Sequence, residues 1–112
     1  MSEALLLLQK YWKHETFRTP QEEIIQSVLD GNDTFALLPT GGGKSVCFQI
    51  PALLLNGICL VVSPLIALMK DQVQNLQSRN IKAIALTGGV SQDEVIDILD
   101  NCQFGNYKFL YL

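Results

Sequence analysis

A glycine-rich segment followed by a lysine and a serine is the part of the sequence best suited to chemistry. Residues 38–45 read Leu-Pro-Thr-Gly-Gly-Gly-Lys-Ser. Consecutive glycines allow a tight turn whose backbone N–H groups point inward, and a helix that begins here adds unpaired amides and partial positive charge. In such a loop Lys44 can reach the terminal phosphates of a nucleotide, and the Ser45 hydroxyl can bind Mg²⁺. The segment predicts a phosphate-binding loop formed by Pro39, Thr40, Gly41, Gly42, Gly43, Lys44 and Ser45.

The loop departs from the strict form of this motif at one position. The strict pattern has glycine eight residues from its end, where this sequence has Leu38. The alternative interpretation is a glycine-rich surface turn with an isolated lysine. A predicted strand before the loop and a predicted helix after it favour the nucleotide site. The motif indicates that a nucleoside triphosphate binds, but it does not say what hydrolysis would drive.

The elements that must position this loop are predicted from apolar runs. Residues 34–38, 58–62, 81–86 and 108–112 are almost continuously apolar, without the alternation of a strand that has one face in water. Such runs are typical of parallel strands covered on both sides. Helical patterns lie between them, so the sequence predicts an α/β fold with a parallel sheet and helices on both faces.

Capping residues mark where the helices begin. Residues 2–12 predict a short helix with Leu5, Leu8 and Trp12 on one face. Three further helix starts are predicted: a capping box from Thr19 to Glu22 with Pro20 in the first position, the pair Ser63-Pro64, and a capping box from Ser91 to Glu94. After Ser63-Pro64, the inward face should hold Leu65, Leu68, Met69, Val73 and Leu76.

Composition limits the class of protein. The 112 residues are 48% hydrophobic and 17% charged, which fits one domain or a piece of one. A net charge of −3 argues against a free-standing nucleic-acid binder, although without the four acids at 93–100 the chain holds seven acids and eight bases. The three cysteines form no Cys-x-x-Cys pair, and no signal sequence or membrane span is recognisable. We therefore expect a cytoplasmic location, with the cysteines reduced and no membrane contact.

Four segments together resemble the RecQ family of ATP-dependent DNA helicases. They read Phe-Arg-Thr-Pro-Gln-Glu-Glu-Ile-Ile at 17–25, the loop at 38–45, Gln-Ile-Pro-Ala at 49–52, and Val-Val-Ser-Pro-Leu-Ile-Ala-Leu-Met-Lys-Asp-Gln-Val at 61–73. The resemblance runs from about Leu8 to the C-terminus. It implies a RecA-like P-loop NTPase fold, with residues 1–112 as the N-terminal portion of the first motor domain and 1–31 as the helices that carry adenine recognition.

The resemblance also implies roles for residues before the loop. Gln21 would read the adenine edge and select ATP over GTP, Arg18 would lie against the nucleotide, and His14 would stack on adenine. The family commonly has Phe-Gly just before that ring, where this sequence has Trp12-Lys13. The alternatives, which the residues alone favour, are a solvated first-turn residue for Gln21 and a surface histidine for His14.

Contacts with DNA are implied at a second group of positions. The resemblance places Ser63 and Pro64 against the phosphate backbone of single-stranded DNA. Lys70 and the corner at Thr87 and Gly88 could add contacts of the same kind. The alternatives are that Ser63 and Pro64 only cap a helix and that Gly88 only makes a turn.

For the parent protein, the resemblance implies ATP- and Mg²⁺-dependent unwinding of duplex DNA with 3′ to 5′ movement, in recombination and repair. Lys44 and Ser45 would be its catalytic residues here, single-strand/duplex junctions its partners, and Zn²⁺ would belong to a C-terminal part. No apolar strand ending in Asp-Glu is present, so we expect a truncated domain without catalysis of its own, nucleoid-associated if bacterial. Another superfamily member such as an RNA helicase, or a nucleotide-binding adaptor without a motor cycle, stays open, as does the oligomeric state.

Overall fold

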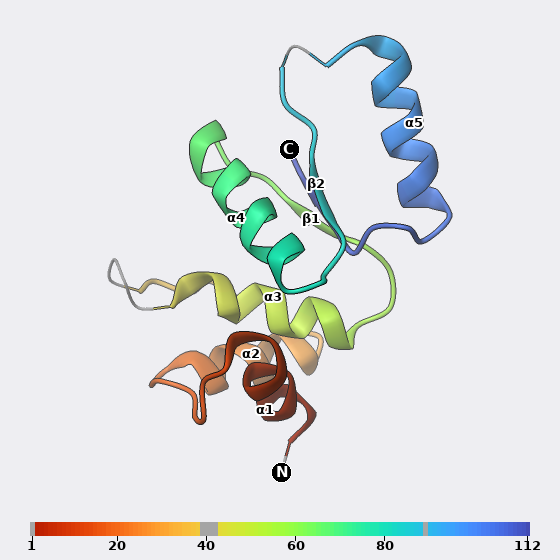
Figure 1. Cartoon of the computed structure of the whole chain (residues 1–112). Helices are drawn as coiled ribbons and strands as arrows, with labels where there is room; N and C mark the ends of the chain where they lie inside the picture. Colours follow the sequence, from red (N-terminus) through yellow and green to blue (C-terminus); the bar gives the residue numbers. More distant parts are fainter. Residues whose placement is uncertain (1, 39–42, 89) are drawn as a thin grey trace. The chain divides into compact units, whose positions relative to one another are not determined.

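The chain combines helices with a small parallel sheet (Figure 1). The computed structural model describes residues 2–38, 43–88 and 90–112. It divides into two units, Met1–Asn56 and Gly57–Leu112, and each is described by itself. The first unit contains helices and the second a three-stranded, all-parallel sheet with two helices. This arrangement confirms the predicted α/β fold class.

The N-terminal helix is confirmed and changes its geometry half-way. Helix α1 (Glu3–Leu7) is capped by Ser2, whose hydroxyl accepts the N–H of Leu5 at 3.1 Å. The chain continues without a break into a turn of π-helix, η1 (Leu8–Trp12). Leu8 is 1% exposed, as the predicted apolar face requires.

Two further helices complete the core of the first unit. Helix α2 (Gln21–Leu29) precedes the phosphate loop and helix α3 (Lys44–Leu54) follows it. The apolar side chains of these helices and α1 share one cluster, and its buried members are Ala4, Leu8, Ile25, Val46 and Ile50. Packing of this kind holds the start of α3 close to the start of α2.

The predicted capping box at the start of α2 is wrong. The helix begins at Gln21, with Pro20 in the N-cap position and no side-chain cap among the described residues. The backbone closes the turn instead, because the N–H of Gln21 donates to the carbonyl of Arg18 at 2.7 Å. Neither Thr19 nor Glu22 is therefore needed to begin the helix.

The predicted strand at 34–38 is also wrong. This segment has no regular secondary structure, and Phe35 and Leu37 are 91% and 86% exposed. A parallel strand forms only against a neighbouring strand. The described part of Met1–Asn56 contains no strand, so the segment has no ladder within its own unit.

The other predicted strands are confirmed, each shortened to three residues. They are β1 (Cys59–Val61), β2 (Ala83–Ala85) and β3 (Phe109–Tyr111). All pairings are parallel, in the order β1-β3-β2. The central strand β3 is wholly buried, whereas β1 and β2 are the outer strands and each pairs with β3 alone in this sheet.

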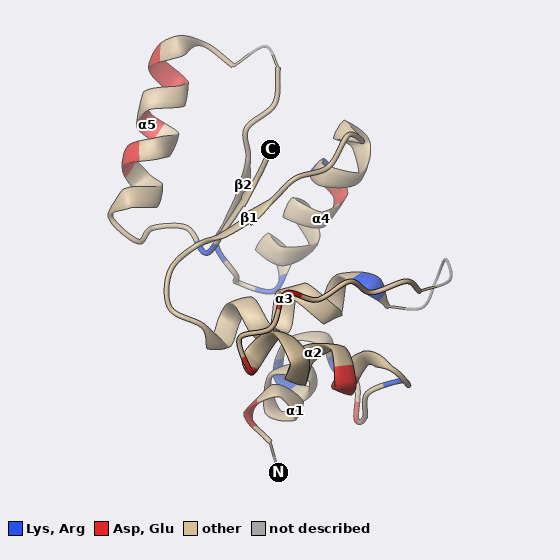
Figure 2. Cartoon of the chain, turned by 180° about the vertical axis from the view of Figure 1, so that it is seen from behind, with Lys and Arg blue, Asp and Glu red and all other residues tan. Residues whose placement is uncertain are grey.

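Two helices flank this sheet within the second unit. Helices α4 (Ile66–Ser78) and α5 (Gln92–Gln103) lie on opposite sides of the strands (Figures 1 and 2). The hydroxyl of Tyr111 donates to the Gln72 carboxamide oxygen at 2.8 Å, which fastens α4 to β3. The prediction of helices on both faces is confirmed for this sheet.

The predicted start of α4 is wrong by two residues. The helix begins after Leu65, while the Ser63 hydroxyl accepts the N–H of Leu65 at 3.2 Å in a local turn. Of the predicted inward residues, Leu65 and Leu68 are 60% and 45% exposed, whereas Met69 is 2% exposed. The buried residues of α4 are Met69, Val73 and Leu76.

The start of α5 follows the prediction, since the Ser91 hydroxyl accepts the N–H of Glu94 at 3.2 Å. Acidic residues are spread along this helix (Figure 2), and none of its residues is buried. Among the described residues no helix could span a bilayer: α4 has 13 residues, against about 20 that a span needs.

A matched pair of truncations tests the burial pattern of the first unit. We expect Ile50→Ala to lower the free energy of unfolding by about 2–5 kcal/mol, because it leaves a cavity in the cluster. Leu37→Ala should change it by about 0.5 kcal/mol or less, because that side chain already lies in water. Urea unfolding of the chain measures both. A similar loss for the two variants would mean that 34–38 is a buried strand after all.

Candidate nucleotide-binding site

The start of α3 has the features of a phosphate site. Helix α3 begins at Lys44, directly after Gly43, which has left-handed backbone geometry with φ 75° and ψ 39°. The helix has eleven residues, and its first turn contains no acid and no side-chain cap. Its first N–H groups therefore favour an anion. Lys44 is exposed beside them and Ser45 is half-buried.

Only part of the predicted loop can be placed. Gly43, Lys44 and Ser45 lie together at the end of the loop, where the helix begins. Pro39, Thr40, Gly41 and Gly42 lie outside the described residues.

The carboxamide of Gln21 joins the two segments that the sequence assigns to the nucleotide. Gln21 is 5% exposed. Its Oε1 accepts the N–H of Arg18 at 2.8 Å, and its Nε2 donates to the carbonyl of Gly43 at 3.2 Å. The alternative of a solvated first-turn residue is therefore wrong. The atoms that could pair with adenine are the same atoms that make these two bonds.

Gly43 is restricted both by its backbone and by Gln21. At its positive φ any L side chain is strained. A Cβ atom at this position would also collide with Nε2 of Gln21. By contrast Gly31, with φ +87°, has open space around the corresponding position. A glycine at 43 thus lets the buried carboxamide approach the loop.

Arg18 and His14 are placed differently relative to this site. Arg18 is exposed and lies beside a hollow of about 270 Å³ at the start of α2, which is also lined by Phe17, Pro20 and Gln26. Its backbone N–H contacts Gln21, so the structure brings these two predicted residues together. His14 is exposed and does not line that hollow.

A small, largely apolar cavity beside Lys44 was not predicted from the sequence. It measures about 220 Å³, and Ile24, Leu38, Lys44, Cys47 and Phe48 are among the residues that line it. Burial raises the pKa of the Cys47 thiol, which opposes ionisation. The three cysteines are free thiols, and Cys47 is buried.

The predicted DNA-contacting residues lie in the second unit, and most of them gather at one edge of its sheet. Ser63 and Pro64 follow the end of β1, and Thr87 and Gly88 follow the end of β2. Because the strands are parallel, both loops leave the sheet at its carboxyl edge. Lys70 is exposed on α4. Ser63 does not cap α4, and its hydroxyl instead accepts the N–H of Leu65 in a local turn. Its contact with DNA stays a prediction.

Comparison with known proteins settles the family. The family model for DEAD/DEAH box helicases matches residues 18–109. The chain belongs to this helicase family. The ATP-dependent DNA helicase RecQ of Synechocystis is 48% identical over 105 residues, covering 94% of this chain and 22% of that protein. RecQ of Bacillus subtilis is 43% identical, covering 97% and 19%.

The helicase relatives extend to animals. The ATP-dependent helicase wrn-1 of Caenorhabditis elegans is 44% identical over 110 residues, covering 98% of this chain and 10% of that protein. These matches confirm the resemblance to RecQ helicases. This helicase chain spans at most about a fifth of the length of these relatives.

A double-mutant cycle tests the contact between Gln21 and Gly43. Gly31→Ala should cost about 1–2 kcal/mol of unfolding free energy from backbone strain alone. Gly43→Ala should cost more, by about 1–3 kcal/mol, because it also displaces a buried carboxamide from its hydrogen bonds. In a Gln21→Ala background that excess should disappear, and chemical denaturation of the four variants measures it. An excess that persists without Gln21 would show that another group crowds Gly43.

Proposed function

We propose that residues 1–112 are the N-terminal portion of the first RecA-like ATP-binding domain of a RecQ-type DNA helicase, with 1–31 as the segment that recognises adenine. The observation that carries this proposal is the buried Gln21 carboxamide, which links the turn at Arg18 to Gly43 at the start of α3. The family match and the names of the relatives support the helicase assignment. The parent protein would unwind duplex DNA with 3′ to 5′ movement, in recombination and repair.

The start of α3 would hold the triphosphate. Its first N–H groups and the exposed ammonium of Lys44 present positive charge, and no described acid in the first turn opposes it. Lys44 would bind the terminal phosphates and stabilise charge on the transferring group. The Ser45 hydroxyl is the natural ligand for Mg²⁺, which when bound would neutralise phosphate charge. These residues fit a magnesium nucleotide.

Hydrolysis would need groups that this part of the chain lacks. Among the described residues no three acids, histidines or cysteines gather as a metal site. The resemblance to RecQ helicases places the acids that would hold the metal opposite Ser45 and position the attacking water outside residues 1–112. We therefore assign nucleotide binding, rather than turnover, to these residues. Zn²⁺, where the parent protein uses it, would belong to another part of that protein.

Adenine recognition would require an exchange of hydrogen bonds at Gln21. Its carboxamide now accepts from Arg18 and donates to Gly43, and the same two atoms match the donor and acceptor of the adenine edge. Binding of adenine would release the Gly43 carbonyl at the end of the phosphate loop. Base recognition and loop geometry would thus be coupled through one side chain. His14, which follows η1 by two residues, would stack on the base as the resemblance implies.

DNA would contact the carboxyl edge of the sheet in the second unit. Ser63 with Pro64, and Thr87 with Gly88, emerge there from the two outer strands, and the exposed Lys70 on α4 would add positive charge. Phosphate contacts of this type fix the register of a strand without reading its sequence. Single-strand/duplex junctions would be the substrate of the whole protein, at a cytoplasmic location and on the nucleoid in a bacterium.

Removal of the Lys44 ammonium in the complete protein tests the proposed function. We expect Lys44→Ala to lower the ATPase rate about 100-fold or more, since charge that stabilises the transferring phosphoryl group is lost. Unwinding of a duplex with a 3′ single-stranded tail should stop. The matched control is Lys10→Ala, which removes an ammonium from η1 and should leave both activities unchanged. An ATPase rate within about twofold of the unaltered protein would contradict the proposal.

A further inference from the structure

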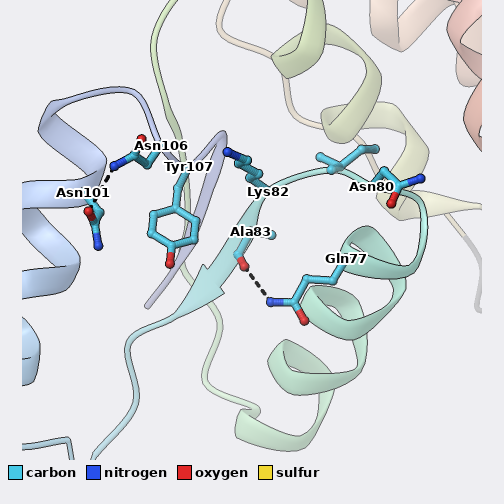
Figure 3. A pocket seen from close by; sticks show the side chains of 8 residues that line it. Gln77, Asn80, Lys82, Ala83, Asn101, Asn106 and Tyr107 are labelled. Atoms are coloured by element: carbon cyan, nitrogen blue, oxygen red, sulfur yellow. Dashed lines mark hydrogen bonds between the residues drawn. The ribbon is translucent and has the colours of Figure 1, made fainter.

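A polar cavity lies in the second unit, and none of the residues assigned to the nucleotide or to DNA lines it. It measures about 670 Å³ (Figure 3). It sits where α4 and α5 end and β2 and β3 begin, so it lies at the amino edge of the strands. Ser63, Thr87 and Gly88 belong to the opposite, carboxyl edge. Its polar lining consists of Gln77, Asn80, Lys82, Asn101, Asn106 and Tyr107.

Two hydrogen bonds fix three of the carboxamides that line this cavity. Gln77 Nε2 donates to the carbonyl of Ala83 at 3.0 Å, and Asn106 Nδ2 donates to Asn101 Oδ1 at 3.0 Å. Each bond uses only one polar atom of each carboxamide. Nδ2 of Asn101 and Oδ1 of Asn106 make no bond to each other, and Figure 3 shows them at the two ends of the pair. Each carboxamide therefore keeps one open polar atom, a donor on Asn101 and an acceptor on Asn106, and a polar group of a nucleobase can bond to either.

An aromatic ring and a single cation complete the lining. Figure 3 shows the ring of Tyr107 between the Asn101–Asn106 pair and Ala83. Tyr107 is half-buried and Lys82 is exposed. Among the described residues, the side chains of Tyr107 and Lys82 have no hydrogen-bond or ionic partner. Of the described residues that line the cavity, Lys82 alone is charged, so this cavity favours a ligand that carries negative charge.

The ends of the two helices do not cancel this charge. Helix C-termini carry partial negative charge on carbonyls that lack partners. Here the N–H groups of Arg79 and Ile81 bond the carbonyl of Leu76, and the N–H of Asn106 bonds the carbonyl of Asn101. These bonds occupy carbonyls in the last turns of both helices. The ammonium of Lys82 is therefore the leading charge at the cavity.

We propose that this cavity binds a nucleotide, separately from the phosphate loop. The base lies on the ring of Tyr107, its edge bonds the carboxamides of Asn101 and Asn106, and its phosphate meets Lys82. The volume of about 670 Å³ lies in the range of about 300–1,000 Å³ that is usual for small-ligand sites. The nucleotide comes either from single-stranded DNA or from a free nucleoside monophosphate, because both present this chemistry.

The test is titration of the labelled 112-residue chain with deoxyadenosine monophosphate, followed by NMR. We expect the side-chain amide signals of Asn101 and Asn106 to shift. Tyr107→Leu should weaken binding about tenfold or more, since a stacked base contributes that much. Phe104→Leu is the matched control, because this ring is 76% exposed outside the lining and its loss should leave affinity unchanged.

Further variants and ligands test which part of the nucleotide Lys82 binds and whether the nucleotide comes from DNA or is free. Lys82→Gln should weaken the binding of the monophosphate but not that of deoxyadenosine. Lys44→Ala should leave both affinities unchanged, because Lys44 belongs to the phosphate loop and not to this cavity. A failure of the nucleotide site proposed at the phosphate loop is therefore distinguishable from a failure of this proposal. A short oligodeoxyadenylate that binds more tightly than the monophosphate identifies single-stranded DNA as the source, and equal affinity identifies the free nucleotide. The proposal is overturned if inorganic phosphate binds as well as the nucleotide, if Tyr107→Leu leaves affinity unchanged, or if no amide signal in the cavity shifts.

Discussion

The buried carboxamide of Gln21 is the contact on which the nucleotide-binding part of the molecule depends. A carboxamide buried without partners costs about 1–3 kcal/mol, so the hydrogen bonds of Gln21 to Arg18 and Gly43 must be made in the folded state. One bond ties the turn before α2 and the other ties the last residue before α3. Gly43 has no side chain to obstruct the contact. The start of α3, with Lys44 beside it, is thereby held at a defined place relative to Arg18.

The sequence predicts those features that local pattern decides. The cap at Ser91 and the helix after Gly43 depend on neighbours along the chain, and the structure has them. The apolar runs of the second unit form strands because they pair with one another. The 34–38 segment shows the limit, because an apolar run becomes a buried strand only where another strand accepts its hydrogen bonds. The hydrogen bond between Gln21 and Gly43 joins positions 22 residues apart, and a glutamine in the first turn of a helix does not by itself predict it.

The sheet unit divides its chemistry between its two edges. The carboxyl edge presents the short loops at Ser63 and Thr87 that the resemblance assigns to DNA. The amino edge holds carboxamides, the Tyr107 ring and Lys82 in one cavity. The sequence analysis missed this cavity, because its lining residues come from α4, α5, β2 and the loops before β2 and β3 and form no motif. The lining residues share one sequence feature, an asparagine or glutamine near the end of each helix. Such residues are common at helix ends, so they predict a shared site only once the fold brings the two ends together.

The most direct test of the account is equilibrium binding of magnesium ATP and magnesium GTP to this chain, with Gln21→Ala beside the unaltered protein. The exposed Gln74→Ala serves as the matched control, and circular dichroism checks that each variant is folded. The account predicts tighter binding of ATP than of GTP, and loss of that preference in Gln21→Ala alone. Equal affinity for the two nucleotides in the unaltered chain, or a preference that survives without Gln21, would contradict it.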